Sequence, residues 1–314
     1  QVTNGRYFMV GDMDDFPFTN HRGRLQAIVP VEDVSLKYAN RWPHIKQVQA
    51  FAYFDGPGMT IDGQIGNTAG TAVEEVTARI ENFAKPVLEI NYQTSTVLPN
   101  LIEFIKQTPL LDNLALDPEQ FAFSGPSSIS GRIHTRLGKS SEPIQVTGNL
   151  QFNGNRFHDQ ISGIVLDGIT GSLDYDRDGL KATGLASTYR DVPVTLDIAS
   201  DWDADEVFRA HLYGKLPVQK VIPDELLQRE PLFKQASGTS DWDINLIVAT
   251  VPGSEDRQTW LEISSDLEGI SIDLPAPMDK SADSDWPMLL RYPISAEQHV
   301  LTVDLLSRLQ LKME

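Results

Sequence analysis

Residues 48–63 read VQAFAYFDGPGMTIDG, in which two runs of alternating apolar and polar residues flank the turn DGPG. Alternation of this kind places successive side chains on opposite faces of a β-strand, and Gly and Pro are typical of the turn between two strands. The stretch ITGSLDYDRDGLKATG at residues 169–184 repeats the pattern 121 positions later. Two glycines keep their places, since Gly58 aligns with Gly179 and Gly63 aligns with Gly184. The two stretches predict one strand–turn–strand unit that is used repeatedly along an extended β structure.

Period-two alternation continues through most of the chain and predicts an all-β fold. The predicted strands cover residues 23–31, 34–38, 47–54, 59–65, 73–80, 87–92, 129–137, 144–152, 164–175, 180–187, 194–198, 208–213, 242–251, 260–264, 270–274 and 299–305. Short turns of mostly two to six residues separate these runs, which favours antiparallel hairpins over crossover connections. The best interpretation is one elongated segment over residues 1–314, and the alternative is two β sandwiches covering residues 1–110 and 119–314.

Helical signals are scarce. Apolar residues recur at helical spacing within residues 96–108, Pro99 is tolerated in a first turn, and Pro109 ends the run. A weaker pattern spans residues 218–228. We expect one or two short helices that cover an edge of the sheet or close one end of it.

The composition excludes several classes of protein. The 314 residues carry 44 acidic and 26 basic side chains, a formal charge of −18, which argues against binding nucleic acid or docking on an anionic membrane. Cysteine is absent, which excludes disulfides and cysteine-ligated metal sites. No run of 18 apolar residues is present, so no segment is expected to span a bilayer. Because the chain opens on Gln1 within patterned sequence, we expect it to be a piece of a longer protein.

Candidate chemical sites are weak. Asp174–Gly179 matches the opening of a calcium loop, but position twelve is Leu185 instead of glutamate, so a solvated hairpin is the better interpretation. The acidic runs Asp12–Asp15 and Asp201–Glu206 could serve a glycan hydrolase, although acidic turn residues are usually only solvated. Motifs of a nucleophile elbow, a phosphate loop or a dinucleotide fold are absent, and no two histidines have ligand spacing. We therefore predict no enzyme, and no catalytic, cofactor-binding or metal-binding residues.

Several motifs, in this order, resemble one known family. They are Gly11–Phe18, Gly23–Ala27, Trp42-Pro43, Phe54–Gly56, Pro86–Ile90, Thr108–Leu110, Ser265–Ile270 and Leu274–Lys280. Together they resemble the YhdP branch of the AsmA-like superfamily, over most of the chain. The resemblance implies an antiparallel sheet curled into a groove with an apolar interior, located in the periplasm of a Gram-negative bacterium. It also implies phospholipid as a partner, and a parent protein anchored in the inner membrane by a helix that this chain lacks. Any outer-membrane partner is left open.

The alternation names the side chains that would line such a groove, because residues two apart share a face. The predicted lining residues are Leu25, Ala27, Val29, Val48, Ala50, Ala52, Phe54, Ile144, Val146, Leu150, Val194, Leu196, Ile198, Ile244, Leu246, Val248, Ile270, Ile272 and Leu274. The prediction for residues 144–152 requires that no bulge interrupts the strand near Gly148. Side chains on the other face are largely polar.

The pattern alone is compatible with two structures. In a sandwich the apolar face would meet a second sheet, and in an open groove it would meet lipid. The resemblance favours the groove, and hence a segment of a bridge that shields phospholipid acyl chains between the inner and outer membranes. A structural scaffold with a dry core is the alternative, and a hydrolase of envelope glycans is a second one.

Overall fold

A computed structural model describes residues 4–16, 18, 22–36, 43–68, 71–107, 121–138, 144–160, 163–222, 234–254, 256–294, 301–305 and 309–313. The chain divides into two compact units. Unit 1 comprises Gln1–Asn155 and Ser172–Arg177, and unit 2 comprises Arg156–Gly171 and Asp178–Glu314. This division does not coincide with a boundary between residues 110 and 119, and those residues lie outside the described ones. The organisation as one elongated segment stays a prediction.

The fold is mostly β, as predicted. Unit 1 contains β1 (Arg6–Val10), η1 (Met13–Asp15), β2 (Arg24–Leu36), β3 (Ile45–Asp55), β4 (Gly58–Thr68), β5 (Thr71–Val73), β6 (Glu75–Ile80), β7 (Val87–Val97), α1 (Leu98–Lys106), β8 (Phe121–Ser124) and β9 (Pro126–Arg136). Strands β10 (Gln145–Asp159) and β11 (Val165–Asp176) have residues in both units. Unit 2 continues with β12 (Leu180–Tyr189), β13 (Val192–Ser200), β14 (Glu206–Pro217), α2 (Val218–Val221), β15 (Ala236–Thr250), β16 (Arg257–Ser265), β17 (Ile270–Ile272), β18 (Met288–Pro293), β19 (Leu301–Leu305) and β20 (Leu309–Met313).

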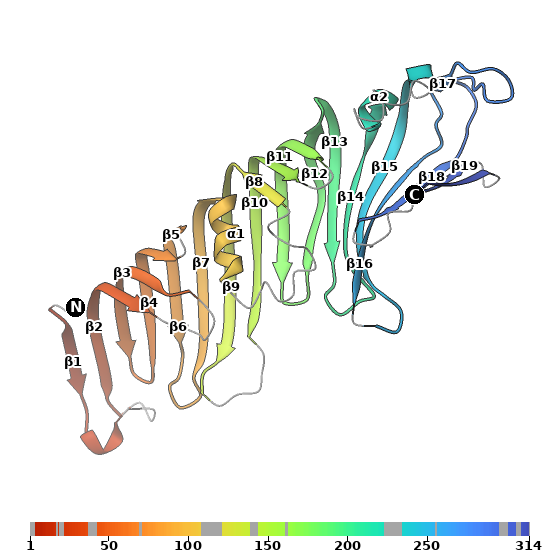
Figure 1. Ribbon diagram of the computed structural model, residues 1–314. Coiled ribbons are helices and arrows are strands. Elements are labelled where there is room, and N and C mark those ends of the chain that lie inside the picture. Colours follow the sequence, from red (N-terminus) through yellow and green to blue (C-terminus); the bar gives the residue numbers. More distant parts are fainter. Residues whose placement is uncertain are drawn as a thin grey trace. The chain divides into compact units, whose positions relative to one another are not determined.

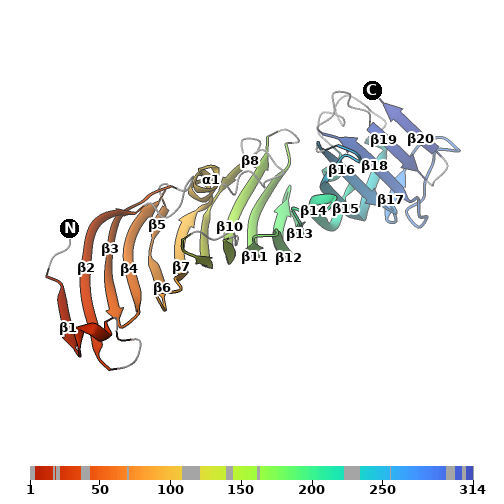
Figure 2. The same ribbon diagram turned by 90° about the horizontal axis from the view of Figure 1, so that it is seen from below.

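Hydrogen bonds between neighbouring strands follow the chain order closely (Figure 1). In unit 1 the antiparallel order is β1, β2, β3, β4, β6, β7, β9 and β10, while β5 pairs with the end of β4. Strands β2, β3 and β4 bend along their length (Figure 2). The described strands thus belong to one antiparallel sheet, and the alternative of two sandwiches is not observed.

Two predicted strands, residues 23–31 and 34–38, form one strand. Strand β2 runs through Leu36, and its register with β3 shifts between Val31 and Val34, where Asp33 has φ 50°. A β-bulge adds a residue without ending the strand, so the alternation breaks although the pairing continues. The prediction of two separate strands was therefore wrong.

Four described strands lie outside the predicted ranges. Strand β20 reads LQLKM and does alternate, whereas the other three lack a clear alternation. Strand β1 reads RYFMV, β18 reads MLLRYP, and β8 has only four residues. Short runs of this kind carry no period-two signal, and only pairing with a neighbour fixes their conformation.

Helix α1 confirms the helix predicted within residues 96–108. It begins after Val97, with Pro99 in its first turn, where a missing N–H costs nothing. Helix α2 contains only four residues, and the predicted helical residues beyond 222 lie outside the described part of the chain. Neither of the two described α-helices has the length and hydrophobicity needed to cross a membrane.

The predicted repeat has structural counterparts. Gly58 opens β4, and a Cβ there would collide with the carbonyl oxygens of Ile80 and Glu81 at the end of β6. Gly179 precedes β12, and a Cβ there would collide with the carbonyl oxygen of Ser200 at the end of β13. In both hairpins a glycine lies at the start of the second strand or directly before it, where the end of a neighbouring strand leaves no room for a Cβ.

The second pair of glycines also has equivalent surroundings. Gly63 lies where the register of β3 and β4 shifts, and Gly184 lies where the register of β12 and β13 shifts. Helix α1 starts at Leu98 and α2 at Val218, 120 positions further on, so the helices keep nearly the spacing of the hairpins. These equivalences support a repeated unit of about 120 residues.

Unit 2 contains a buried lysine that joins two segments carrying the family resemblance. Lys280 is 4% exposed, and its ammonium donates to the carbonyl oxygens of Leu267 and Ile270 at 2.8 and 2.9 Å. It also donates to the carbonyl oxygens of Ser281 and Ser284. Burial lowers the pKa of Lys280, and the nearby carboxylates, Asp266 foremost, act in the opposite direction. Residues 265–270 and 274–280 are therefore held together by one cation among four carbonyl groups.

We expect Gly58→Ala to destabilise the protein by about 1–3 kcal/mol, because the added methyl group meets rigid backbone instead of a movable side chain. Gly63→Ala is the matched control in the same strand, since its Cβ would make only ordinary contacts with Val76. Urea unfolding of the two variants measures the difference. Equal stabilities would contradict the proposed steric role of Gly58.

Lys280→Met should lower the free energy of unfolding by about 3 kcal/mol, because it leaves buried carbonyl groups without their charged donor. Lys181→Met, at an exposed position of β12, should change stability by less than about 0.5 kcal/mol. Thermal and chemical unfolding of both variants would test this, and a stable Lys280→Met protein would refute the role of the ammonium.

Candidate functional site: the apolar face of the sheet

The register of unit 1 aligns apolar side chains from many strands on one face. Residues that are directly paired in an antiparallel sheet point to the same side, so the pairing defines rows across the strands. One row contains Ala27, Phe54, Met59, Ile80 and Leu88, and the next contains Val29, Ala52, Ile61, Ala78, Ile90, Ile133 and Val146. We call these two rows the apolar strip. Charged side chains are absent from both rows.

The opposite face of the same strands is mostly polar. One of its rows contains Pro30, Phe51, Asp62, Thr77, Asn91, Arg132 and Thr147. Arg132 contacts Glu89 at 3.3 Å and donates to Asn91, and Arg24 contacts Asp55 at 3.3 Å. Such exposed ion pairs contribute little to stability, but they mark this side as the one that faces water.

Most side chains of the apolar strip are only partly buried. Ala52 and Ile80 are buried, whereas the other members, such as Val29, Ile61 and Ile90, keep intermediate exposure. In a sandwich core these side chains would be covered by a second sheet. Among the described residues of unit 1, no second sheet covers the strip.

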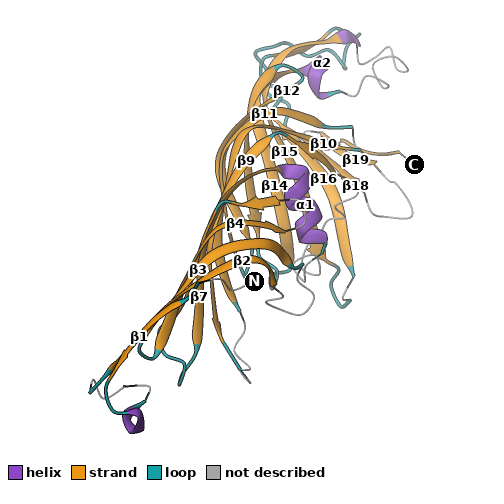
Figure 3. Cartoon of the chain, turned by 90° about the vertical axis from the view of Figure 1, so that its left-hand side faces the viewer, coloured by secondary structure: helices purple, strands orange, loops and turns teal. Residues whose placement is uncertain are grey.

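One end of this face is closed. Beyond the apolar strip, Thr94 and Ser127 are almost fully buried, as are Leu150 and Phe152 on β10. Their neighbours on the polar face, Gln93 and Ser95, stay exposed. The cover therefore lies on the apolar face, and α1 supplies it, since α1 contacts β5, β7 and β8 and lies on one side of the sheet (Figure 3).

Unit 2 repeats the division into two faces. One row contains Leu185, Leu196, Leu212, Ile244, Ile263, Leu290 and Val303, and another contains Ala182, Ile198, Ala210, Leu246, Leu261 and Tyr292. The opposite face carries Asp197, His211, Asn245, Glu262 and Arg291 in one row. Leu185, Leu196, Leu212 and Ile244 in the first row are buried, whereas most of the second row keeps intermediate exposure, as the strip of unit 1 does.

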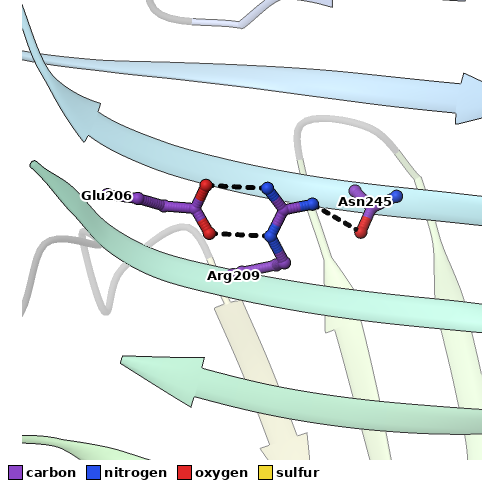
Figure 4. A network of polar contacts seen from close by, with 3 residues as sticks. All are labelled: Glu206, Arg209 and Asn245. Atoms are coloured by element: carbon purple, nitrogen blue, oxygen red, sulfur yellow. Dashed lines mark hydrogen bonds and ion pairs between the residues drawn. The ribbon is translucent and has the colours of Figure 1, made fainter. Parts of the chain in front are cut away.

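A polar network occupies the opposite face of unit 2. Arg209 makes two hydrogen bonds of 2.7 Å to Glu206 and donates to Asn245 at 3.0 Å (Figure 4). The hydrogen bonds to Arg209 lower the pKa of Glu206, and Glu206 raises the pKa of Arg209. Nearby, His211 lies 2.8 Å from Asp243, and Arg291 pairs with Glu262. Opposite charges are paired in this network, which lies at exposed to part-buried positions of the polar face.

The structure brings most of the predicted lining residues onto these apolar faces. Those in regular register are Leu25, Ala27, Val29, Ala50, Ala52, Phe54, Val146 and Leu150 in unit 1, and Val194, Leu196, Ile198, Ile244, Leu246 and Val248 in unit 2. Val48 pairs with Val34 beside the bulge, and Ile144 precedes β10. Strands β9 and β10 pair without a shift at Gly148, as the prediction required. Their contact with lipid stays a prediction.

The last group of predicted lining residues, Ile270, Ile272 and Leu274, is placed differently from the others. Strand β17 ends at Ile272, so Leu274 lies outside it, and β17 pairs with the first residues of β15. Ile270 is buried next to the Lys280 carbonyl cluster. This group therefore belongs to the packed end of unit 2.

Several residues of the same faces were not predicted. Some lie in strands whose alternation was recognised, so the sequence contained the signal for them: Met59, Ile61, Ile90 and Ile133. The strand register places them on the apolar face. Trp242 was not among the predicted lining residues. Its indole N–H donates to the carbonyl oxygen of Leu216, a contact that only the fold reveals.

Two tyrosines interrupt the apolar face of unit 1. Tyr92 continues a row of small residues, Val31, Ala50, Gly63 and Val76, and it pairs with Gly131. Its ring lies over Gly131, and the ring of Tyr175 lies over Gly148, because a Cβ on either glycine would collide with a phenol. The two hydroxyl oxygens are 2.6 Å apart. Burial raises the pKa of both phenols, and for Tyr175 the neighbouring Tyr92 adds to the rise.

The acidic hairpin considered for calcium has another arrangement. Asp174 accepts a hydrogen bond of 2.7 Å from Asn149 on the polar face. Within the described part of the chain, no three acidic or histidine side chains converge in a way that could hold a metal ion.

A comparison with protein families places the chain. The family model described as YhdP protein matches residues 1–314. The chain belongs to the YhdP family. It is 22% identical over 287 residues to a protein of Escherichia coli strain K12 named "Intermembrane phospholipid transporter YhdP". That match covers 90% of the chain and 22% of the relative, so the chain spans about a fifth of the relative's length. No solved structure matches the chain.

We expect the two buried phenols to titrate late in alkaline solution. A raised pKa in the folded state means that the associated stability is present below the ordinary tyrosine pKa of 10.0 and is lost as the pH rises through the folded value. In a spectrophotometric titration, Tyr92→Phe and Tyr175→Phe should each remove absorbance change from the late phase. Loss of early absorbance in either variant would contradict the burial of the pair.

Proposed function

We propose that this chain is a periplasmic segment of a phospholipid carrier, and that it shields acyl chains on the apolar face of its sheet. The observation that carries the proposal is the apolar strip of unit 1, which is aligned across β2 to β10 and is left partly exposed by the described residues. Membership in the family and the name of the E. coli relative support the choice of phospholipid.

The free energy of an acyl chain depends on whether water or apolar side chains surround it. Each acyl methylene costs about 0.8 kcal/mol in water relative to an apolar site, so about thirty methylenes cost roughly 25 kcal/mol. A face of aligned apolar side chains replaces one apolar environment with another, and movement along it needs little free energy. The polar headgroup remains in water. No nucleophile, metal ion or cofactor takes part in such a process.

Unit 1 is the better candidate for holding lipid. Both rows of its strip are mostly half-exposed, whereas the first row of unit 2 contains the buried side chains Leu185, Leu196 and Leu212. A tightly packed face favours the alternative of a structural scaffold with a dry core, and we assign that role to the packed end of unit 2 around Lys280. The proposal therefore assigns carriage to the strip and support to the packed end.

The cellular setting belongs to the same proposal. The parent protein would be anchored in the inner membrane, and the segment would lie in the periplasm between the two membranes. The formal charge of −18 makes docking of this segment on an anionic membrane surface unfavourable, so delivery would require other parts of the parent protein. A role as a hydrolase of glycans has no support from the polar networks described above, whose carboxylates are engaged in ion pairs at exposed positions.

Native mass spectrometry of protein purified without detergent tests the proposal, because a carrier should retain phospholipid. Val29→Asp should reduce the retained lipid at least tenfold, since it places a carboxylate on the strip, where desolvation of a charge is costly. Because Val29 is only half-buried, the fold should survive the change.

Ile28→Asp is the matched control. Ile28 is adjacent in the same strand, and its side chain lies on the opposite face and is 45% exposed. It should leave the retained lipid unchanged. A wild-type protein that carries no lipid, or two variants that retain equal amounts, would refute the assignment of the strip.

A further inference from the structure

On strand β7, hydroxyl side chains follow the apolar strip along the same face of the sheet. On β7 the residues of this face are, in order, Leu88, Ile90, Tyr92, Thr94 and Thr96. The first two belong to the apolar strip, and the last two lie toward the end covered by α1. Tyr92 therefore lies between the half-exposed strip and the end of the face that α1 covers. Tyrosine is typical of such boundaries because its ring is apolar and its hydroxyl needs a polar partner.

Glycines create the space for the tyrosine pair. Gly131 and Gly148 are directly paired, and any side chain at either position would occupy the volume of a phenol ring. The rings thus lie along the sheet, and their hydroxyl groups meet above neighbouring strands. Both tyrosines keep intermediate exposure, so the pair borders the open strip.

The hydrogen bonds of the pair leave one hydroxyl proton without a well-placed acceptor. Two hydroxyl groups provide two protons, and the 2.6 Å contact between them uses one. The other acceptor within reach is the carbonyl oxygen of Ser130, 3.3 Å from the Tyr175 oxygen. That distance exceeds the range of about 2.5–3.0 Å for hydroxyl donors. A better acceptor that approaches from the strip would therefore gain this proton at little cost to the protein.

We propose that the hydroxyl pair of Tyr92 and Tyr175 binds the ester carbonyl of a phospholipid whose acyl chains lie on the apolar strip. The inference rests on the proposed function. An ester carbonyl accepts hydrogen bonds and cannot donate them, which matches the unused proton. It is also the polar group next to the acyl chains of a diacyl lipid, as the tyrosine pair borders the apolar strip. The pair would fix the depth at which a lipid lies and would select ester-linked chains.

A competition between two phospholipids with the same headgroup and chains tests this. One is a diester and the other is the diether analogue, which lacks the carbonyl oxygen. Native mass spectrometry of the full chain, offered both lipids at equal concentration, gives the ratio bound. We expect the wild-type protein to favour the diester by about two- to tenfold, the value of one hydrogen bond. The double variant Tyr92→Phe/Tyr175→Phe should bind both lipids equally, at the level of the diether on the wild type.

The controls separate this inference from the proposed function. Tyr53→Phe, on the opposite face, should keep the wild-type preference. Binding of neither lipid by the wild type would overturn the proposed function and this inference together. Binding of both lipids without preference, or a preference that survives in the double variant, would overturn only the tyrosine subsite. A double variant with a lower melting temperature and an unchanged lipid ratio would assign the pair a structural role alone and would likewise overturn it.

Discussion

A sheet can bury one face only if something lies against it, and that constraint determines how unit 1 must be understood. Hydrogen bonding aligns apolar residues from β2 to β10 in continuous rows, because directly paired residues share a face and the alternation is kept across most strands. The polar side chains of the opposite face point toward water or form ion pairs and hydrogen bonds with amide groups. Among the described residues of unit 1, α1 and its surroundings cover the apolar face at one end. Partial exposure of aligned apolar rows indicates a face for a ligand or for further protein.

Unit 2 shows how the same pattern behaves when the face is packed. Its rows are also apolar, yet Leu185, Leu216 and Val248 are fully buried. The Lys280 ammonium contributes to this packed end, since it binds the carbonyl oxygen of Ile270 in β17, which pairs with β15, and three further carbonyl oxygens. A buried cation is stable only when its hydrogen bonds are complete, and four carbonyl oxygens meet that condition. Sequence pattern alone does not separate an open face from a packed one.

The sequence allowed the strands, the turn glycines and the division into two faces to be predicted, because all three depend on neighbours in the chain. Val29 and Ala52 could be assigned to one face from alternation alone. What alternation could not supply was the partner of each strand. The bulge at Asp33 joins two predicted strands, and β1 and β18 have no periodic signal. Trp242 and Lys280 acquire their roles from backbone carbonyls that are distant in sequence. Such contacts are properties of the register and the packing.

The tyrosine pair illustrates why a functional detail can be invisible in sequence and plain in structure. Tyr92 and Tyr175 are 83 positions apart, and each lies in an ordinary strand. Only the register places Gly131 and Gly148 beneath their rings and brings their hydroxyls together. An apolar face that holds acyl chains must also end somewhere, because every phospholipid has a polar part. The two phenols lie where the apolar strip ends, and one of their hydroxyl protons lacks a well-placed acceptor. They can therefore donate a hydrogen bond to the polar part of a lipid.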